Sequence, residues 1–512
     1  MTTSPQSPSP HRLSSEVHTA ARNAFHLGMS LVATWGVALV VRLWLPRHLG
    51  PDRFGLYTFA ENFAAMSLGF LSFGIDPYIQ KEIPVRPKHA SDFFGGAAVL
   101  RSLLAIVVLA ALQLVLTATG RTPEAHRLVL VFGLGYMVVN LNNSLASLLQ
   151  ANTTVGGLAA VNVVGKVVWG VLVWVGIVGK APIEARAAAF LVAELIRAIS
   201  LQALARRHVA LEMRVDLRAA WTVILVSLPF YANSLAIALG SRLDVTMLAF
   251  ITHDNHEVGW YGSASNLAGL AFLLAPLMHS VLLPLLSRAY ARSEDGFWRI
   301  LRRAAEALIV AGTPVVLVLT LGADIWVRLA FGQPFLPAAS SLRALAPQFV
   351  LTYLAVLYSM ALMVRGDGWA LTSISIVGVI VNPVLAFLLV PWTRQFGPGG
   401  AGIGSGLALI AAELVVASLL LWRLGRPALD SRLVAVAVGT VAAASFTMVL
   451  HELVNGLGIW RVVLDLAAYG ILATVFGALR PQKLIAMLRE LRTSRGPAAA
   501  AMAGPSDEGA PG

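Results

Sequence analysis

Five basic residues stand inside stretches of sequence that are otherwise almost wholly apolar. They are Arg42, Arg101, Lys166, Arg197 and Arg242. A charge within the hydrocarbon of a membrane is costly, so such residues usually face an internal cavity or a partner. Guanidinium and ammonium groups also pair strongly with phosphate. The pattern therefore predicts a path for an anionic headgroup such as a diphosphate. Snorkelling to the membrane surface, or structural ion pairing, is the alternative.

The five cations are expected at staggered depths in the membrane. Lys166 and Arg197 fall in the middle or cytoplasmic part of their predicted spans. Arg101 is about eight residues, or roughly 12 Å, from the cytoplasmic end of its span. Arg42 and Arg242 fall toward the outer face. A diphosphate could then pass from the deeper cations to the outer ones, and no single site would need to bind it too tightly.

Carboxylates also occur in the apolar stretches. Glu61, Asp76 and Asp244 are candidates for binding a coupling cation, H+ or Na+. For Glu61 an interhelical hydrogen bond is an equal alternative. Glu194 lies three residues before Arg197, a spacing that allows an ion pair on one helix face and favours a structural role for Glu194.

No other cofactor is expected. The chain has no Cys, which removes thiolate catalysis and Cys-ligated metals. The Gly-rich stretch at 397–402 lacks the strand, Lys and Ser/Thr of a P-loop.

The composition places these residues in a membrane protein. Of the 512 residues, 57% are hydrophobic and 12% are charged, and the mean hydropathy is +0.75. This excludes an ordinary soluble domain. The apolar runs are long and continuous rather than short and alternating, which predicts a bundle of transmembrane helices and excludes a barrel. We expect an all-α membrane protein with about fourteen transmembrane helices.

Two halves of the chain carry the same short motifs. Gly, Tyr, Ala and Asn recur as G-x-Y-x-x-A-x-N in Gly55–Asn62 and again in Gly259–Asn266. Ala193–Leu195 is repeated as Ala412–Leu414, each followed by an Ala and a Leu at the same spacing. Internal repeats of this kind are typical of transporters. We therefore expect two six-helix lobes related by the repeat, plus two C-terminal helices.

The repeat also exposes an asymmetry in charge. Arg197 aligns with Val416, although the Ala-Glu-Leu beside it is kept. Lys166 aligns with Val379 in the same way. The second copy shows that apolar residues suffice for folding at these positions, so the charges of the first copy point to function.

The expected organisation is a disordered cytoplasmic tail at 1–20, an N-terminal lobe at 21–210, a C-terminal lobe at 211–425, two further helices at 426–482 and a cytoplasmic tail at 483–512. Basic residues concentrate in alternate loops, which predicts a multi-pass protein of the bacterial inner membrane with both termini in the cytoplasm. The formal charge of +12 follows from those loops and does not indicate nucleic acid.

Several further stretches resemble the polysaccharide-export or oligosaccharide-flippase family of the multidrug/oligosaccharidyl-lipid/polysaccharide (MOP) superfamily. They are Leu49–Tyr57, Leu68–Ile75, Asp244 followed by Val258–Tyr261, Phe331–Gln333 with Phe335 and Ala338–Ala339, and Gly397–Gly404. The resemblance implies a V-shaped pair of lobes, alternating access, and transfer of an undecaprenyl-diphosphate-linked oligosaccharide to the outer leaflet. In members that handle the peptidoglycan lipid it also implies basic cavity residues, to which the five cations correspond in type.

We therefore expect a flippase for exopolysaccharide, capsule or O-antigen (lipopolysaccharide) assembly. Its partners would be the lipid-linked oligosaccharide, membrane lipid, and a polysaccharide polymerase and chain-length regulator. The alternatives are a cation-coupled multidrug exporter of the same fold, which would want an acidic cavity, and a membrane polymerase or ligase, which would want a large external loop. A non-transporting membrane scaffold fits the repeat and the buried charges less well.

Overall fold

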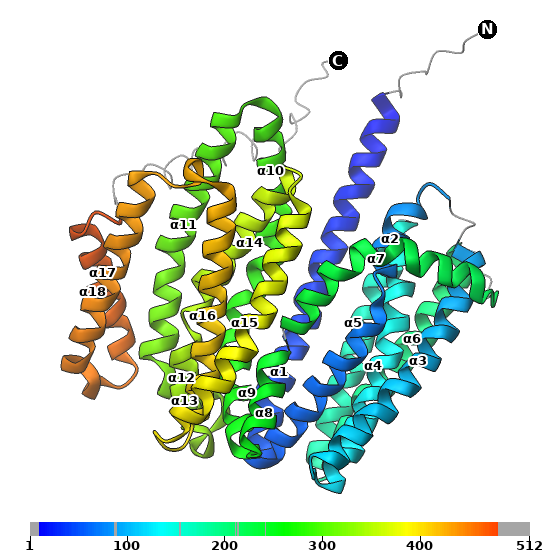
Figure 1. Ribbon diagram of the computed structural model, residues 1–512, viewed down its shortest axis with the longest axis horizontal. Helices are drawn as coiled ribbons and strands as arrows, with labels where there is room; N and C mark the ends of the chain where they lie inside the picture. The colour runs from blue at the N-terminus through cyan, green and yellow to red at the C-terminus, as the bar shows by residue number, and fades with distance from the viewer. Residues whose placement is uncertain are drawn as a thin grey trace, which may run out of the picture.

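The computed structural model describes residues 10–86, 90–152, 155–209, 211, 214–240 and 242–479, and within them every regular element is helical (Figure 1). The first helix, α1 (Pro10–Gly69), bends at Gly50, whose φ of 74° is left-handed and is followed by Pro51. Glycine adopts that conformation without strain, and proline disfavours a straight continuation. The first half of the chain continues through α2 (Ile75–Glu82), α3 (Ala90–Ala118), α4 (Pro123–Ala151), α5 (Val155–Val178) and α6 (Ile183–Val209).

The second half contains twelve further helices among the described residues. They are α7 (Leu217–Gly240), α8 (Leu243–Thr252), α9 (Asn255–Leu270), α10 (Ala275–Arg292), α11 (Glu294–Leu321), α12 (Ala323–Phe331), α13 (Ala338–Leu345), α14 (Gln348–Val364), α15 (Gly368–Arg394), α16 (Gly400–Leu424), α17 (Ser431–Val454) and α18 (Trp460–Val475). Nine segments of the described chain are long and apolar enough to cross a membrane. The helix order is compatible with the expected fourteen spans. The expected all-α membrane fold is confirmed.

The internal repeat appears in the structure as a repeated break. The second span of the first half is interrupted by a short 3-10 turn at Phe70–Ser72, and the second span of the second half by one at Ala271–Leu274. In the first half, Phe73 and Gly74 take left-handed φ values of 48° and 66° before α2 begins. Each break lies at the end of the helix that carries the G-x-Y-x-x-A-x-N motif.

The two copies of that motif pack directly against each other, where α1 crosses α9. A Cβ on Gly55 would lie 1.8 Å from the backbone oxygen of Asn255, and a Cβ on Gly259 would lie 2.0 Å from that of Pro51. Backbone atoms cannot turn aside as a side chain can, so only glycine permits this crossing. The repeated glycines therefore set how closely the two halves approach.

The crossing lies at one end of the molecule, which we call the distal end. It contains α8, α12 and α13 and is at the bottom of Figure 1, whereas α1 begins at the proximal end at the top. At the distal end, Arg47 donates to the carbonyl of Leu329 (2.7 Å) and Arg121 to that of Ala249 (2.6 Å). Each bond joins the first half to the second.

The apolar core is shared by the two halves at one end of the molecule and separate at the other. One large cluster mixes residues of both halves, including Phe59, Leu128, Val258 and Phe335. Two other clusters are separate: one is built around α2, α3 and the start of α7, and the other around α10, α11, α14 and α16. The lobes are therefore joined by a common core toward the distal end and keep separate cores toward the proximal end.

Two expected boundaries differ from the structure. Residues 10–20, expected to be disordered, continue α1, because no Pro or Gly interrupts the chain between Pro10 and Gly28; residues 1–9 and 483–512 lie outside the described residues. The start of α7, assigned to the C-terminal lobe, packs instead with the N-terminal lobe, where Ala220 and Ile224 join the cluster of α2 and α3. α8 packs on α15 and α16 of the other lobe.

Candidate functional site

Two of the five predicted cations meet in one cavity of the N-terminal lobe. This N-lobe cavity, of about 390 Å³, lies among α1, α4, α5 and α6. Its lining includes Lys166 and Arg197, with Asn162, Trp169 and Glu194. The cavity therefore combines two cations with one carboxylate and an apolar wall.

Arg197 is held in place by its own neighbours. Its Nη1 lies 3.2 Å from Oε2 of Glu194, and its Nε donates to Oδ1 of Asn162 (3.2 Å). Glu194 Oε2 also accepts from Nδ2 of Asn142, which is fully buried, at 2.8 Å. The predicted pair between Glu194 and Arg197 is confirmed. Because Glu194 has two donors, its charge is compensated within the lobe.

Lys166 is placed differently. Its Nζ lies 5.0 Å from the centre of the Trp169 ring, within the range of a cation–π contact. No carboxylate of a described residue forms an ion pair with it, and Arg42, itself exposed, acts on it only as a further positive charge. The N-lobe cavity thus carries a net positive charge that its own residues do not neutralise.

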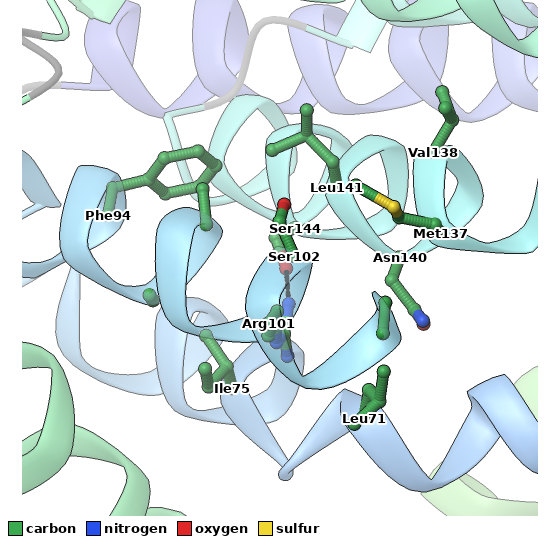
Figure 2. A pocket seen from close by; sticks show the side chains of 13 residues that line it. Leu71, Ile75, Phe94, Arg101, Ser102, Met137, Val138, Asn140, Leu141 and Ser144 are labelled. Carbon is green, nitrogen blue, oxygen red and sulfur yellow. Dashed lines mark hydrogen bonds between the residues drawn. The ribbon is translucent and has the colours of Figure 1, made fainter. Parts of the chain in front are cut away.

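Arg101 lies in another cavity, of about 90 Å³, among α2, α3 and α4 (Figure 2). Its Nη1 donates to Oγ of Ser144 at 2.8 Å, and Ser144 donates in turn to Asp76 at 2.6 Å. The other end of the guanidinium donates to the carbonyl of Ser72, in the helix break. Arg101 and Asp76 therefore fix the break before α2, and the structure does not bring them into the N-lobe cavity.

Arg242 and Glu61 belong to a polar cluster where the lobes meet. Arg242, at the start of α8, donates from Nη1 to Oδ1 of Asn62 on α1 at 3.1 Å. The hydroxyl of Tyr136 on α4 lies 3.4 Å from Glu61 Oε1 and is also a hydrogen-bond partner of Arg242. The interhelical hydrogen bond proposed as the alternative for Glu61 is therefore present. Coupling through Glu61 stays a prediction.

A third cavity, which we call the C-lobe cavity, occupies the place in the other lobe that is equivalent to the N-lobe cavity. It measures about 600 Å³ and lies among α8, α9, α10, α14, α15 and α16. Gly378, Val379, Glu413 and Val416 line it, and they are the repeat partners of Gly165, Lys166, Glu194 and Arg197 in the N-lobe cavity.

The packing inside the two cavities is also repeated. A Cβ built on Gly165 would meet the side chain of Arg197 at 3.6 Å, and one built on Gly378 would meet Val416 at 2.6 Å. The same pair of helices therefore crosses at the same glycine in each lobe. What differs is the side chain presented there.

Asp244, the third candidate for a coupling cation, lines the C-lobe cavity. It is 8% exposed and accepts a hydrogen bond of 2.7 Å from the hydroxyl of Tyr261, the motif tyrosine of the second half. Sequence reasoning identified Asp244 and the repeated Ala412–Leu414, which contains Glu413, but missed the cavity that holds both carboxylates. Its polar residues come from six helices and share no spacing along the chain.

The fold is the one seen in solved structures of MOP superfamily transporters. The structure of the lipid II flippase MurJ in an inward closed conformation matches with a TM-score of 0.62 at 12% identity, covering 88% of this chain and 100% of that one. An inward-facing multidrug resistance MATE transporter of the MOP superfamily matches with a TM-score of 0.59 at 17% identity, covering 76% and 94%.

A MOP superfamily transporter from Pyrococcus furiosus, described by the reverse polarity of its binding pocket, matches with a TM-score of 0.55 at 18% identity, covering 80% and 96%. No curated protein matches the sequence. A family model described as "Polysaccharide biosynthesis protein" matches residues 20–290, more than half of the chain. The chain belongs to that family.

Proposed function

We propose that the protein is a flippase for an undecaprenyl-diphosphate-linked oligosaccharide. It would carry this lipid from the cytoplasmic to the outer leaflet of the bacterial inner membrane by alternating access, for exopolysaccharide, capsule or O-antigen assembly. The N-lobe cavity is the observation that carries the proposal. Its two cations stand where the repeat partner has valines, and a diphosphate is the part of such a cargo that cations bind.

The cations have distinct roles in this proposal. Lys166 and Arg197 receive the diphosphate while the lobes are apart at the proximal end. Arg42, exposed on α1, and Arg242, between the lobes, receive it later. Arg101 was predicted to act with the first pair; its contacts with Ser144 and Ser72 support a positioning role through the α2 break.

The arrangement of the lobes supports entry from one side. The common core at the distal end closes that side, and the separate cores at the proximal end leave the other side free to open. If the proximal end is cytoplasmic, as the basic loops predict, the structure represents a state before transfer. Reporter fusions near residues 121 and 254 should then report the outside, and fusions after residue 480 the cytoplasm. A periplasmic C-terminus would contradict this orientation.

One observation favours a second candidate. The lining of the C-lobe cavity includes the carboxylates Glu413 and Asp244 and no Lys or Arg. A multidrug exporter of cationic compounds would need an acidic cavity of this kind. The N-lobe cavity would repel such compounds, so the flippase is preferred.

Deletion of the gene tests the choice between the two. The flippase predicts loss of surface polysaccharide, with the lipid-linked precursor accumulating in the cytoplasmic leaflet, where it is protected from a periplasmic glycosidase. Normal polymer with an altered tolerance to cationic drugs would support the exporter. Partnership with a polymerase and a chain-length regulator predicts that both co-purify with the protein after crosslinking.

A further inference from the structure

The C-lobe cavity is lined by hydrogen-bonding groups, not all of which have a partner within the part of the chain that the structure describes. Asn382 on α15 is 5% exposed, and its amide makes no hydrogen bond to any described residue. The hydroxyl of Thr352 on α14 is buried beside Glu413, and Gln348 and Ser375 also line the space. A buried amide without a partner costs free energy unless a ligand or water satisfies it. These groups therefore point to a polar ligand.

The charges around the cavity narrow the class of that ligand. The titratable side chains on its walls are Glu413 from α16, Asp244 from α8 and His279 from α10. Glu413 lacks the arginine that compensates Glu194, because Val416 stands in its place. Carboxylates repel a diphosphate, so the phosphate end of a cargo is excluded from this lobe.

We propose that the C-lobe cavity binds the glycan of the lipid-linked oligosaccharide, while the N-lobe cavity binds its diphosphate; the inference rests on the proposed function. Carboxylate and amide oxygens accept hydrogen bonds from sugar hydroxyls, and the amide NH₂ donates to them. The volume of about 600 Å³ lies within the range of small-molecule sites, roughly 300–1,000 Å³. The ring of Phe272 adds apolar surface to the cavity wall, against which a sugar ring can pack.

Binding of the diphosphate in one cavity and of the glycan in the other would orient the cargo. One lobe attracts the charged end and the other repels it, so a molecule with a diphosphate at one end and a neutral glycan at the other fits in one direction only. Arg242 and Asp244, two residues apart at the start of α8, mark the boundary: the first reaches Asn62 of the N-terminal lobe and the second lines the C-lobe cavity.

Photocrosslinking in cells that make the native cargo tests the proposal. Phe272 and Phe190 each line their own cavity and can each be replaced by photoreactive p-benzoylphenylalanine. After irradiation, vicinal diols on the adduct are oxidised with periodate and labelled with a hydrazide, before and after mild acid cleaves the sugar–phosphate bond. We expect an acid-stable label at position 272, where the glycan is bound directly, and an acid-labile label at position 190.

Each outcome decides a different question. An acid-labile label at both positions, or a label at 190 alone, overturns the glycan site and leaves the flippase standing. No label at either position counts against the flippase itself.

Variants of Glu413 separate glycan binding from cation coupling. Glu413→Gln keeps the hydrogen-bonding capacity, so polymer export should fall less than about threefold, whereas Glu413→Leu should lower it about tenfold or more. The control is Ser373→Ala, which is exposed on the neighbouring helix α15 and should export normally. If Glu413→Gln abolishes export as completely as Glu413→Leu, the carboxylate binds H+ or Na+ and the glycan assignment is wrong.

Discussion

The N-lobe and C-lobe cavities are built on one frame and differ in charge. Both lie where two helices cross at a glycine, and both keep the glutamate of Ala-Glu-Leu. In the N-lobe cavity a lysine and an arginine surround that glutamate, and in the C-lobe cavity two valines do. The repeat therefore fixes where a cavity forms, and a few substitutions at fixed positions decide what it can bind.

The comparison also shows how a buried charge can be held. The carboxylate of Glu194 is buried and accepts hydrogen bonds from Arg197 and Asn142. The carboxylate of Glu413 faces a cavity whose lining residues include no Lys or Arg. A compensated carboxylate orients its neighbour, and an uncompensated one is available to a ligand.

The largest effect is expected from neutralising the N-lobe cavity. Arg197→Met keeps much of the length but removes a contact of about 1.5–3 kcal/mol to phosphate, so export should fall roughly ten- to hundredfold. Arg197→Lys should retain partial export, since charge matters more than packing here. Val416→Met, at the repeat position, is the matched control. Surface polymer is measured at equal protein levels.

Lys166→Met and Arg101→Met complete that series. Wild-type export by Arg197→Met, Lys166→Met and Arg101→Met, each at matched expression, would show that the cations do not handle the cargo. The charge difference between the lobes would then be a matter of structure alone.

Arg101→Met should act on stability before it acts on transport. It removes the donor to Ser144 and to the Ser72 carbonyl, while the hydrogen bond from Ser144 to Asp76 is kept; losing a hydrogen bond from a charged donor costs about 1.5–3 kcal/mol. The midpoint of thermal unfolding in detergent should fall. Ser102→Ala, in the same small cavity, should leave it unchanged. An unchanged midpoint with lost export would instead place Arg101 in contact with cargo.

Gly259→Ala should push the lobes apart at the distal end. Its new methyl would lie 2.0 Å from a backbone oxygen, and such overpacking costs roughly 1–3 kcal/mol, which shifts the population about five- to 150-fold. The chain has no native Cys, so spin labels at Arg127 and Arg343 report the distance between lobes without background. Gly36→Ala, with nothing within 4 Å of its new Cβ, is the control. Identical distance distributions would show that the crossing does not set the closed state.

The smallest effect is expected for one hydroxyl of the C-lobe cavity. Ser375→Ala removes a single neutral hydrogen bond, about 1 kcal/mol, so export should fall about fivefold at most. Ser373→Ala, on the same helix but exposed, should have no effect. Each hydroxyl donates a hydrogen bond to a carbonyl of its own helix, so both variants lose such a bond. A difference in export between the variants therefore does not come from that loss. Equal export by the two variants would mean that Ser375 does not touch the cargo.

The sequence predicted the features that repeat and the features that are local. The two halves, the ion pair of Glu194 with Arg197, and the contrast of Lys166 with Val379 all follow from spacing along the chain. The partner of Arg101 could not be predicted, because the Ser72 carbonyl is free only where the helix breaks. Nor could the C-lobe cavity, whose polar groups meet only after six helices have packed.

The position of α7 shows the same limit. Its composition is that of any apolar span, and nothing in it indicates that it packs with α2 and α3 as well as with α15 of the lobe it precedes. Which helices α7 packs against depends on surfaces that are brought together by tertiary packing, and the pattern of apolar residues in one helix does not predict it.

The common core at the distal end has a consequence for the speed of the cycle. To release cargo on that side, rings such as Phe54 against Phe335 and Phe59 against Phe250 must part, and water must enter between them. Exposure of apolar surface to water raises the heat capacity. If this step limits turnover, a plot of the logarithm of the transport rate against inverse temperature should be curved rather than straight. The factor by which polymer export changes per ten degrees should then differ between low and high temperatures.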